Sequence, residues 1–140
     1  MMPELLSWDH VSFGYESHFK IQNISHGLSK GDFTLFFGPN GAGKTTLFRL
    51  GVGLLKPTSG EVRCRDKKLA EISQTEFARD VAYLEQDIHY FFPFTVEEIV
   101  MMGRYPHTGS SFFDRKGDYE KAAWAMEITG VLRFAKRSIF

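Results

Sequence analysis

The chain of 140 residues, 43% hydrophobic and 24% charged, is long enough for one soluble globular domain and too short for two substantial ones. Its formal net charge of +0 at pH 7 argues against a basic surface for nucleic acid or an anionic membrane, although a local positive site is possible. The single cysteine, Cys64, excludes an intrachain disulfide and suits a small buried strand residue. The N-terminus lacks the features of a secretory signal, and no stretch approaches the ~20 apolar residues of a membrane helix.

The first half of the chain is expected to form strands around one helix. Residues 5–15 alternate and carry β-branched and aromatic side chains, which predicts a strand. The apolar run "FTLFFG", residues 33–38, is too short for a helix and predicts a central strand buried on both faces of a parallel-type sheet. Residues 44–55 place leucines at helical spacing and predict a helix, which "KPTSG" ends. Alternation over residues 61–69 predicts another strand.

Helices and loops are expected to predominate in the second half. The segment "SQTEFAR" suits a short helix, and it precedes residues 80–86, a compact apolar run with strand character. Thr95 and Glu98 form a T-x-x-E capping box, which predicts a helix over residues 96–103. Residues 103–117 are rich in Gly, Ser and Pro and are expected to be a loop.

A last helix is expected over residues 118–130. Its predicted apolar face is formed by Tyr119, Ala122 or Ala123, and Met126, and Gly130 is expected to end it. The order of these elements indicates a strand-rich core followed by a helical part, within an α/β fold.

The segment "GPNGAGKTT" matches the pattern of a phosphate-binding loop between a strand and a helix. Its glycines allow successive backbone N–H groups to turn inward around an anion, and the helix that follows points its positive dipole end at the same place. Lys44 adds a charge for the β- and γ-phosphates, and the Thr45 hydroxyl can bind Mg²⁺. The candidate nucleotide-binding residues are Gly38, Pro39, Asn40, Gly41, Ala42, Gly43, Lys44, Thr45 and Thr46. A glycine-rich turn with a solvated lysine is the alternative.

Because kinases, GTPases, helicases and transport ATPases share this loop, other features must choose the class. The "GPNGAGKTT" form of the loop, "VSFGY" before it and "LLKPTSGEV" after it resemble the ATP-binding-cassette family, a P-loop ATPase fold. The resemblance implies that Tyr15 stacks on adenine and that Gln86 occupies the Q-loop position, reaching Mg²⁺ and the attacking water as the catalytic residue. It also implies a nucleotide-binding core over residues 1–87 and a partial helical subdomain over residues 88–140. ATP and Mg²⁺ are the expected cofactors.

The segment "FTVEEIVMMGRYPH" resembles the ATPases of importers for iron-siderophore, haem and cobalamin. Such a protein would lie in the cytoplasm at the inner face of the cell membrane, with no nucleic-acid partner. Its expected partners are permease subunits, a second ATPase subunit and, indirectly, a substrate-binding protein. Residues 91–105 are expected to face the permease, and the alternative is that the aromatic cluster at residues 89–94 closes the helical part onto the core.

This chain departs from the family pattern in two respects. Glu85 precedes Gln86 where the family more often has proline, and the sequence contains no signature motif, Walker B acid or switch histidine. The chain is therefore expected to be a truncated ATPase that holds nucleotide but hydrolyses it poorly. Two alternatives stay open: a small nucleotide kinase or switch protein, in which "VAYLE" is a Walker B strand ending at Glu85, and a cassette ATPase that does not serve transport.

Overall fold

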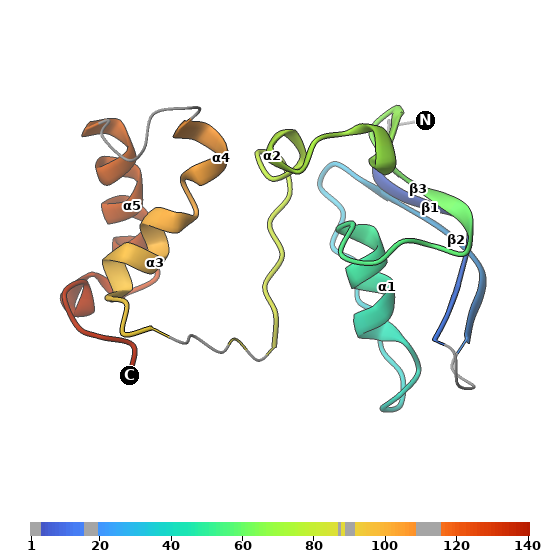
Figure 1. The fold of residues 1–140 in the computed structure, drawn as a ribbon, viewed down its shortest axis with the longest axis horizontal. Helices are drawn as coiled ribbons and strands as arrows, with labels where there is room; N and C mark the ends of the chain where they lie inside the picture. The colour runs from blue at the N-terminus through green and yellow to red at the C-terminus, as the bar shows by residue number, and fades with distance from the viewer. Residues whose placement is uncertain (1–3, 16–19, 87, 89–91, 109–115) are drawn as a thin grey trace. The chain divides into compact units, whose positions relative to one another are not determined.

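The computed structural model describes residues 4–15, 20–86, 88, 92–108 and 116–140 of the chain. These residues form two compact units, Met1–Phe77 and Ala78–Phe140, each of which has its own set of packed elements (Figure 1). The assignment of a nucleotide-binding core to residues 1–87 stays a prediction.

The first unit contains a four-stranded antiparallel sheet in the order β2-β1-β3-β4. The predicted strand over residues 5–15 is confirmed as β1, and the strand predicted over residues 61–69 forms a hairpin of β3 and β4. The strand β2 was not predicted from the sequence. The strands are β1 (Glu4–Gly14), β2 (Lys20–Ser29), β3 (Ser59–Cys64) and β4 (Lys67–Lys68).

Helix α1 (Lys44–Gly51) packs on one face of this sheet and completes the core of the first unit (Figure 1). Leu50 and Val11 are fully buried, and the buried Trp8 ring donates a hydrogen bond of 3.2 Å from Nε1 to the Leu47 carbonyl. A Cβ atom on Gly51 would lie 2.4 Å from the Trp8 ring, so the close approach of helix and strand requires glycine there. Cys64 is buried in β3, as expected for a small strand residue.

Two short elements complete the first unit, the 3₁₀ turn η1 (Leu69–Glu71) and helix α2 (Gln74–Phe77). Helix α2 confirms the short helix expected in "SQTEFAR", and it buries Phe77.

The strands predicted over residues 33–38 and 80–86 do not form in the structure. The side chain of Phe33 is 94% exposed, so residues 33–38 are not buried on both faces as expected, and the side chain of Leu84 in the other segment is 84% exposed. A parallel strand of this kind needs a hydrogen-bonded neighbour, and no strand of the described residues pairs with either segment. The predicted parallel-type arrangement is therefore wrong for these residues, and the sheet that forms is antiparallel.

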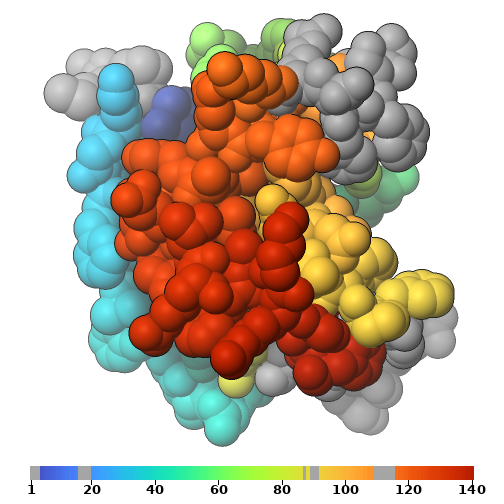
Figure 2. Space-filling view, turned by 90° about the vertical axis from the view of Figure 1, so that its left-hand side faces the viewer, coloured from blue at the N-terminus to red at the C-terminus, as the bar shows by residue number. Residues whose placement is uncertain are grey.

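The second unit is built from helices α3 (Val96–Met102), α4 (Tyr105–Thr108) and α5 (Lys116–Ile128), followed by the 3₁₀ turn η2 (Leu132–Phe134). Helices α3 and α5 pack together and bury Met101, Ala122 and Met126. Figure 2 shows the orange and red residues of α5 and the C-terminal segment as one continuous surface of this unit. The loop predicted over residues 103–117 is wrong for residues 105–108, which form α4, and for residues 116–117, where α5 begins, while residues 109–115 lie outside the described residues.

The last helix follows its prediction closely. Its buried face includes Ala122 and Met126 as expected, whereas Tyr119 is 48% exposed. Gly130 has a φ of 73°, the left-handed conformation of a residue that ends a helix.

The beginning of α3 confirms the predicted capping box. The backbone N–H of Glu98 donates to the Thr95 hydroxyl at 3.3 Å, and the Thr95 N–H donates to the Glu98 carboxylate at 2.7 Å. The bond from the Thr95 backbone lowers the pKa of Glu98, with a further contribution from the Thr95 hydroxyl. Two more amides of this first turn, those of Val96 and Glu97, donate to carbonyls of the C-terminal segment. The helix therefore begins at a position that is fixed by several bonds.

We expect Thr95→Ala to lower the free energy of unfolding of the second unit by about 0.5–2 kcal/mol, because it removes the acceptor for the Glu98 amide. Thr95→Ser keeps the hydroxyl and is the matched control, which should retain most of that stability. Urea denaturation followed by circular dichroism measures both variants. Equal stability of wild type and Thr95→Ala would contradict this role.

The capping box also leads us to expect that the stability of the second unit depends on pH. Since folding lowers the pKa of Glu98, the stability contributed by its carboxylate is complete above the ordinary value of 4.5 and is lost as the pH falls through the folded-state pKa. Thr95→Ala keeps the backbone N–H and removes only the hydroxyl bond to the Glu98 carboxylate, so the part of the stability difference from wild type that comes from this bond should shrink in acid. Urea denaturation of both proteins at neutral and at acidic pH measures this change.

Candidate functional site

The predicted phosphate-binding loop lies directly before α1 in the first unit. Gly41 and Gly43 have φ angles of 81° and 94°, in the left-handed region that residues with a Cβ rarely adopt. The loop closes on itself through a hydrogen bond of 3.2 Å from the Ala42 N–H to the Pro39 carbonyl. Gly41 faces open space, because a Cβ there would meet no atom within 4 Å. The loop thus has the glycine-dependent geometry that an anion cradle needs.

The first residues of α1 offer hydrogen-bond donors to a ligand at this loop. Gly43 is the N-cap residue and offers no side chain, and the first intrahelical bond runs from the Leu47 N–H to the Gly43 carbonyl at 2.8 Å. The amides of Lys44, Thr45 and Thr46 precede that bond, so no helical carbonyl accepts from them. No acidic side chain occurs in the first turn. The positive end of the helix dipole is therefore available to a negatively charged ligand.

The Lys44 ammonium group is held at the same loop. Its Nζ donates to the carbonyl oxygens of Gly38, at 2.7 Å, and Pro39, at 2.9 Å. An ammonium group has three donors, so these two bonds leave a third for a phosphate oxygen. Lys44 therefore adds a full positive charge beside the amide donors. The sequence predicted this charge, but it contained no signal for the two carbonyl contacts.

The remaining candidate residues are placed as follows. Asn40 and Thr45 are exposed and Thr46 is half-buried, so the Thr45 hydroxyl is accessible to a metal ion bound to a nucleotide. Tyr15 directly follows β1 and is 47% exposed, and its ring lies 4.9 Å from that of Phe13. Gln86 is exposed and belongs to the second unit, so its predicted role beside the γ-phosphate stays a prediction.

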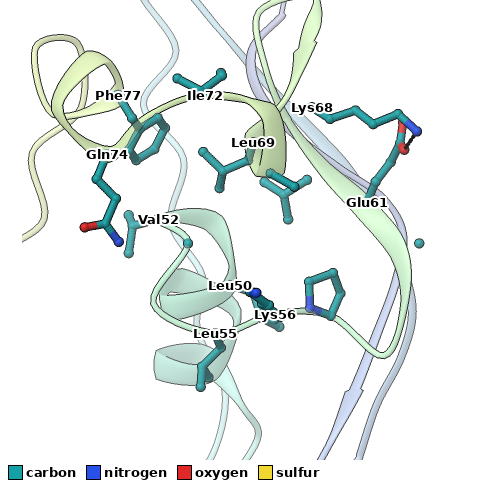
Figure 3. Close-up of a pocket in the computed structure, with 15 residues that line it drawn as sticks. Leu50, Val52, Leu55, Lys56, Glu61, Lys68, Leu69, Ile72, Gln74 and Phe77 are labelled. Carbon is teal, nitrogen blue, oxygen red and sulfur yellow. Dashed lines mark ion pairs between the residues drawn. The ribbon is translucent and has the colours of Figure 1, made fainter.

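A separate pocket of about 440 Å³ lies at the other end of α1 (Figure 3). Apolar side chains of Leu50, Leu69 and Phe77 form much of its wall, and an ion pair of 2.6 Å between Glu61 and Lys68 lies at its edge. The hydrogen bond from Lys68 lowers the pKa of Glu61. The nearby C-terminus of α1 is the negative end of the helix dipole, which disfavours phosphate. The loop, and not this pocket, is therefore the candidate nucleotide site.

The chain belongs to the ABC transporter family, whose model matches residues 21–139. The Hemin import ATP-binding protein HmuV of Methylobacillus flagellatus is 38% identical over 128 residues, which cover 91% of this chain and 47% of that protein. The Ferric enterobactin transport ATP-binding protein FepC of Escherichia coli is 33% identical over 134 residues, covering 96% of this chain and 49% of that protein. The chain thus spans about half the length of these relatives.

The fold agrees with this membership. The structure of an ABC transporter assigned to the metal-chelate type, in an inward-facing conformation, superimposes with a TM-score of 0.75 at 27% identity, over 97% of this chain and 48% of that chain. The predicted α/β fold of a partial ABC ATPase is therefore confirmed, and the family argues against a small nucleotide kinase. Within the described residues, no helix has the length and apolar character needed to span a membrane.

Proposed function

We propose that this chain binds MgATP as part of the ATP-binding subunit of an ABC importer. The observation that carries the proposal is the loop before α1. It contains two glycines in the left-handed conformation, helix amides that no helical carbonyl accepts from, and the Lys44 ammonium group, which is bound to the same loop. The backbone amides and the ammonium group are hydrogen-bond donors, and no acidic side chain in the first turn of α1 repels an anion. A nucleotide triphosphate is the ligand whose charge this donor set fits.

Each candidate residue then has a distinct task. The backbone amides of residues 41–46 hold the phosphate oxygens, and Lys44 binds the β- and γ-phosphates. The exposed Thr45 hydroxyl is a ligand for Mg²⁺, which neutralises phosphate charge when bound. Tyr15 stacks on adenine, and Gln86 orients the attacking water. That this chain holds nucleotide but hydrolyses it poorly stays a prediction.

The importer part of the proposal draws on the relatives. Two of them are named for hemin import and ferric enterobactin transport, so we propose an iron chelate, haem or cobalamin as cargo. The partners are permease subunits, a second ATPase subunit and, indirectly, a substrate-binding protein, and the place of action is the cytoplasmic face of the membrane. ATP-dependent closure of two ATPase subunits would move the permease.

The permease contact is proposed to include exposed side chains of residues 91–105. Of this segment, Phe91 lies outside the described residues. The rings of Phe92 and Tyr105 are 64% and 58% exposed and Met102 is 42% exposed, whereas Phe94 is half-buried. Such exposure of large apolar side chains on a folded unit suits a protein contact.

We expect Phe92→Ser, in the whole protein assembled with its permease, to lower ATP-dependent uptake by about tenfold or more, because buried aromatic anchors dominate interface energies. Nucleotide affinity should stay near that of wild type. Uptake of a radiolabelled iron chelate into proteoliposomes measures the first, and calorimetric titration with MgATP measures the second.

Phe33→Ser removes a still more exposed ring from the first unit and is the matched control. Normal uptake with Phe92→Ser would contradict the contact. Unfolding of the second unit by Phe92→Ser would instead support the alternative that these aromatic residues close the helical part onto the core.

A further inference from the structure

The pocket at the C-terminal end of α1 lies entirely within the first unit (Figure 3). Its volume of about 440 Å³ is within the range of about 300–1,000 Å³ that is usual for small-molecule sites. Well-packed interiors contain few voids larger than a water molecule, so ordinary packing does not explain a space of this size. Since an apolar cavity of about 150 Å³ holds one benzene molecule, this pocket has room for a ligand of about 10 to 20 non-hydrogen atoms.

The wall of the pocket is mainly apolar. Figure 3 shows side chains of the η1–α2 segment opposite those of α1 and the turn that follows it. The side chains that matter most here are those of Leu50, Val52, Val62, Leu69, Ile72 and Phe77. Leu50, Val62 and Phe77 are buried, so the deeper part of the wall belongs to the interior of the unit. An apolar ligand would therefore remove apolar surface from water on binding, which is favourable in proportion to the area.

The turns that carry this wall are fixed before any ligand binds. The Gly53 N–H donates to the Leu50 carbonyl at 3.1 Å, which holds the turn after α1. The Ile72 N–H donates to the Leu69 carbonyl at 3.2 Å, which holds the end of η1. Leu69 also packs against the core cluster of the unit. A pocket that is formed in advance costs less conformational entropy on binding.

The charged groups at the pocket favour neither a cation nor an anion. Among the described residues, the charged side chains that line it are Lys56, Glu61 and Lys68. The Glu61 carboxylate is already paired, with Lys68 at 2.6 Å and with Arg63 at 2.9 Å, so it is not available to a cationic ligand. Lys56 is exposed to water, and the negative end of the α1 dipole opposes an anion beside it. A charged ligand would therefore lose its hydration without a good counter-charge.

We propose that this pocket is a second ligand site, which binds a small uncharged molecule with an apolar body. The site goes beyond the proposed function, because α1 separates it from the phosphate-binding loop. This helix has eight residues and is therefore about 12 Å long. MgATP and the apolar ligand should consequently bind without displacing each other. Because the ligand binds the folded state, it should also stabilise the first unit.

The probe for this site is 1-naphthol, which is uncharged at pH 7 and has about ten non-hydrogen atoms, a size that the pocket admits. We expect saturable amide NMR shifts in the full chain with a Kd of about 1 mM or tighter. The largest should occur at Val52, Gly53 and Leu69, with or without MgATP. Naphthalene-1-sulfonate and 1-naphthylmethylamine add a negative or a positive charge to the same ring system, and each should bind at least about fivefold more weakly.

Two variants fill the pocket from different walls. Val52→Phe and Ile72→Phe should each weaken 1-naphthol binding by about fivefold or more, because the added ring occupies the space of the ligand. Leu54→Phe is the matched control, since Leu54 is 55% exposed and is not among the described residues that line the pocket. It should keep the affinity within about twofold of wild type. Urea denaturation followed by circular dichroism shows whether each variant is folded.

Three results would overturn the proposal: no saturable shifts at the pocket in wild type, tighter binding of either charged analogue than of 1-naphthol, or unchanged affinity in both filled variants. The shifts in wild type locate the ligand even if a filled variant does not fold.

Discussion

Lys44→Ala is expected to weaken MgATP binding by about 10- to 150-fold, because a hydrogen bond to a charged group contributes about 1.5–3 kcal/mol. In the structure, the ammonium group already lies on the loop through its bonds to the Gly38 and Pro39 carbonyls. It therefore needs little rearrangement to reach a phosphate oxygen. The variant also leaves those two carbonyls without this donor. Calorimetric titration with MgATP measures the change in affinity.

Lys30→Ala is the matched control, since Lys30 is an exposed lysine of the first unit that follows β2. It should leave the affinity within about twofold of wild type, because exposed charges that do not touch the ligand are screened by solvent and salt. An equal, small effect of both variants would contradict the assignment of Lys44 to the phosphates.

Asp118→Ala is expected to lower the free energy of unfolding of the second unit by about 3–5 kcal/mol. Asp118 accepts a hydrogen bond of 2.9 Å from Arg104 Nε, and the side chains of Arg104 and Asp118 are only 17% and 8% exposed. Removing the carboxylate leaves the guanidinium group without its counter-charge in a largely buried place. Urea denaturation followed by circular dichroism measures the loss.

Helix α5 contains its own control for this prediction. Lys116 and Glu120 form an exposed ion pair at 3.9 Å, and Glu120→Ala should cost no more than about 0.5 kcal/mol. Partial burial and then Arg104 lower the pKa of His107, whereas Asp118 raises it. Asp118→Ala should therefore lower the pKa of His107 further, which an NMR titration of the ring would show. Equal stability losses for the two alanine variants would contradict the burial argument.

Local signals were sufficient to predict several elements. The capping box of Thr95 and Glu98 involves only neighbouring residues, so its pattern predicts the beginning of α3. Gly130 likewise ends its helix region through a local conformation that favours glycine. The glycine spacing before Lys44 predicts the left-handed positions that the structure shows. These features depend on a few consecutive residues, and the sequence displays them directly.

Features that depend on partners distant in sequence could not be predicted in this way. The apolar run at residues 33–38 has strand character, but a strand forms only when another strand pairs with it, and none of the described residues does so. Strand β2 was missed because it mixes polar and apolar residues and contains Asn23 in the left-handed conformation. The contact between Phe13 and Tyr15 has no signal beyond the spacing of two aromatic residues.

The central claim, that the loop before α1 binds a nucleotide triphosphate, is tested most directly by amide NMR spectra recorded during a MgATP titration. We predict that the largest saturable shifts occur at the amides of Gly38, of residues 40–46 and of Tyr15, and that magnesium tripolyphosphate reproduces those of the loop without that of Tyr15. Shifts confined to the pocket at the other end of α1, around Leu69 and Phe77, or the absence of saturable shifts, would contradict the claim.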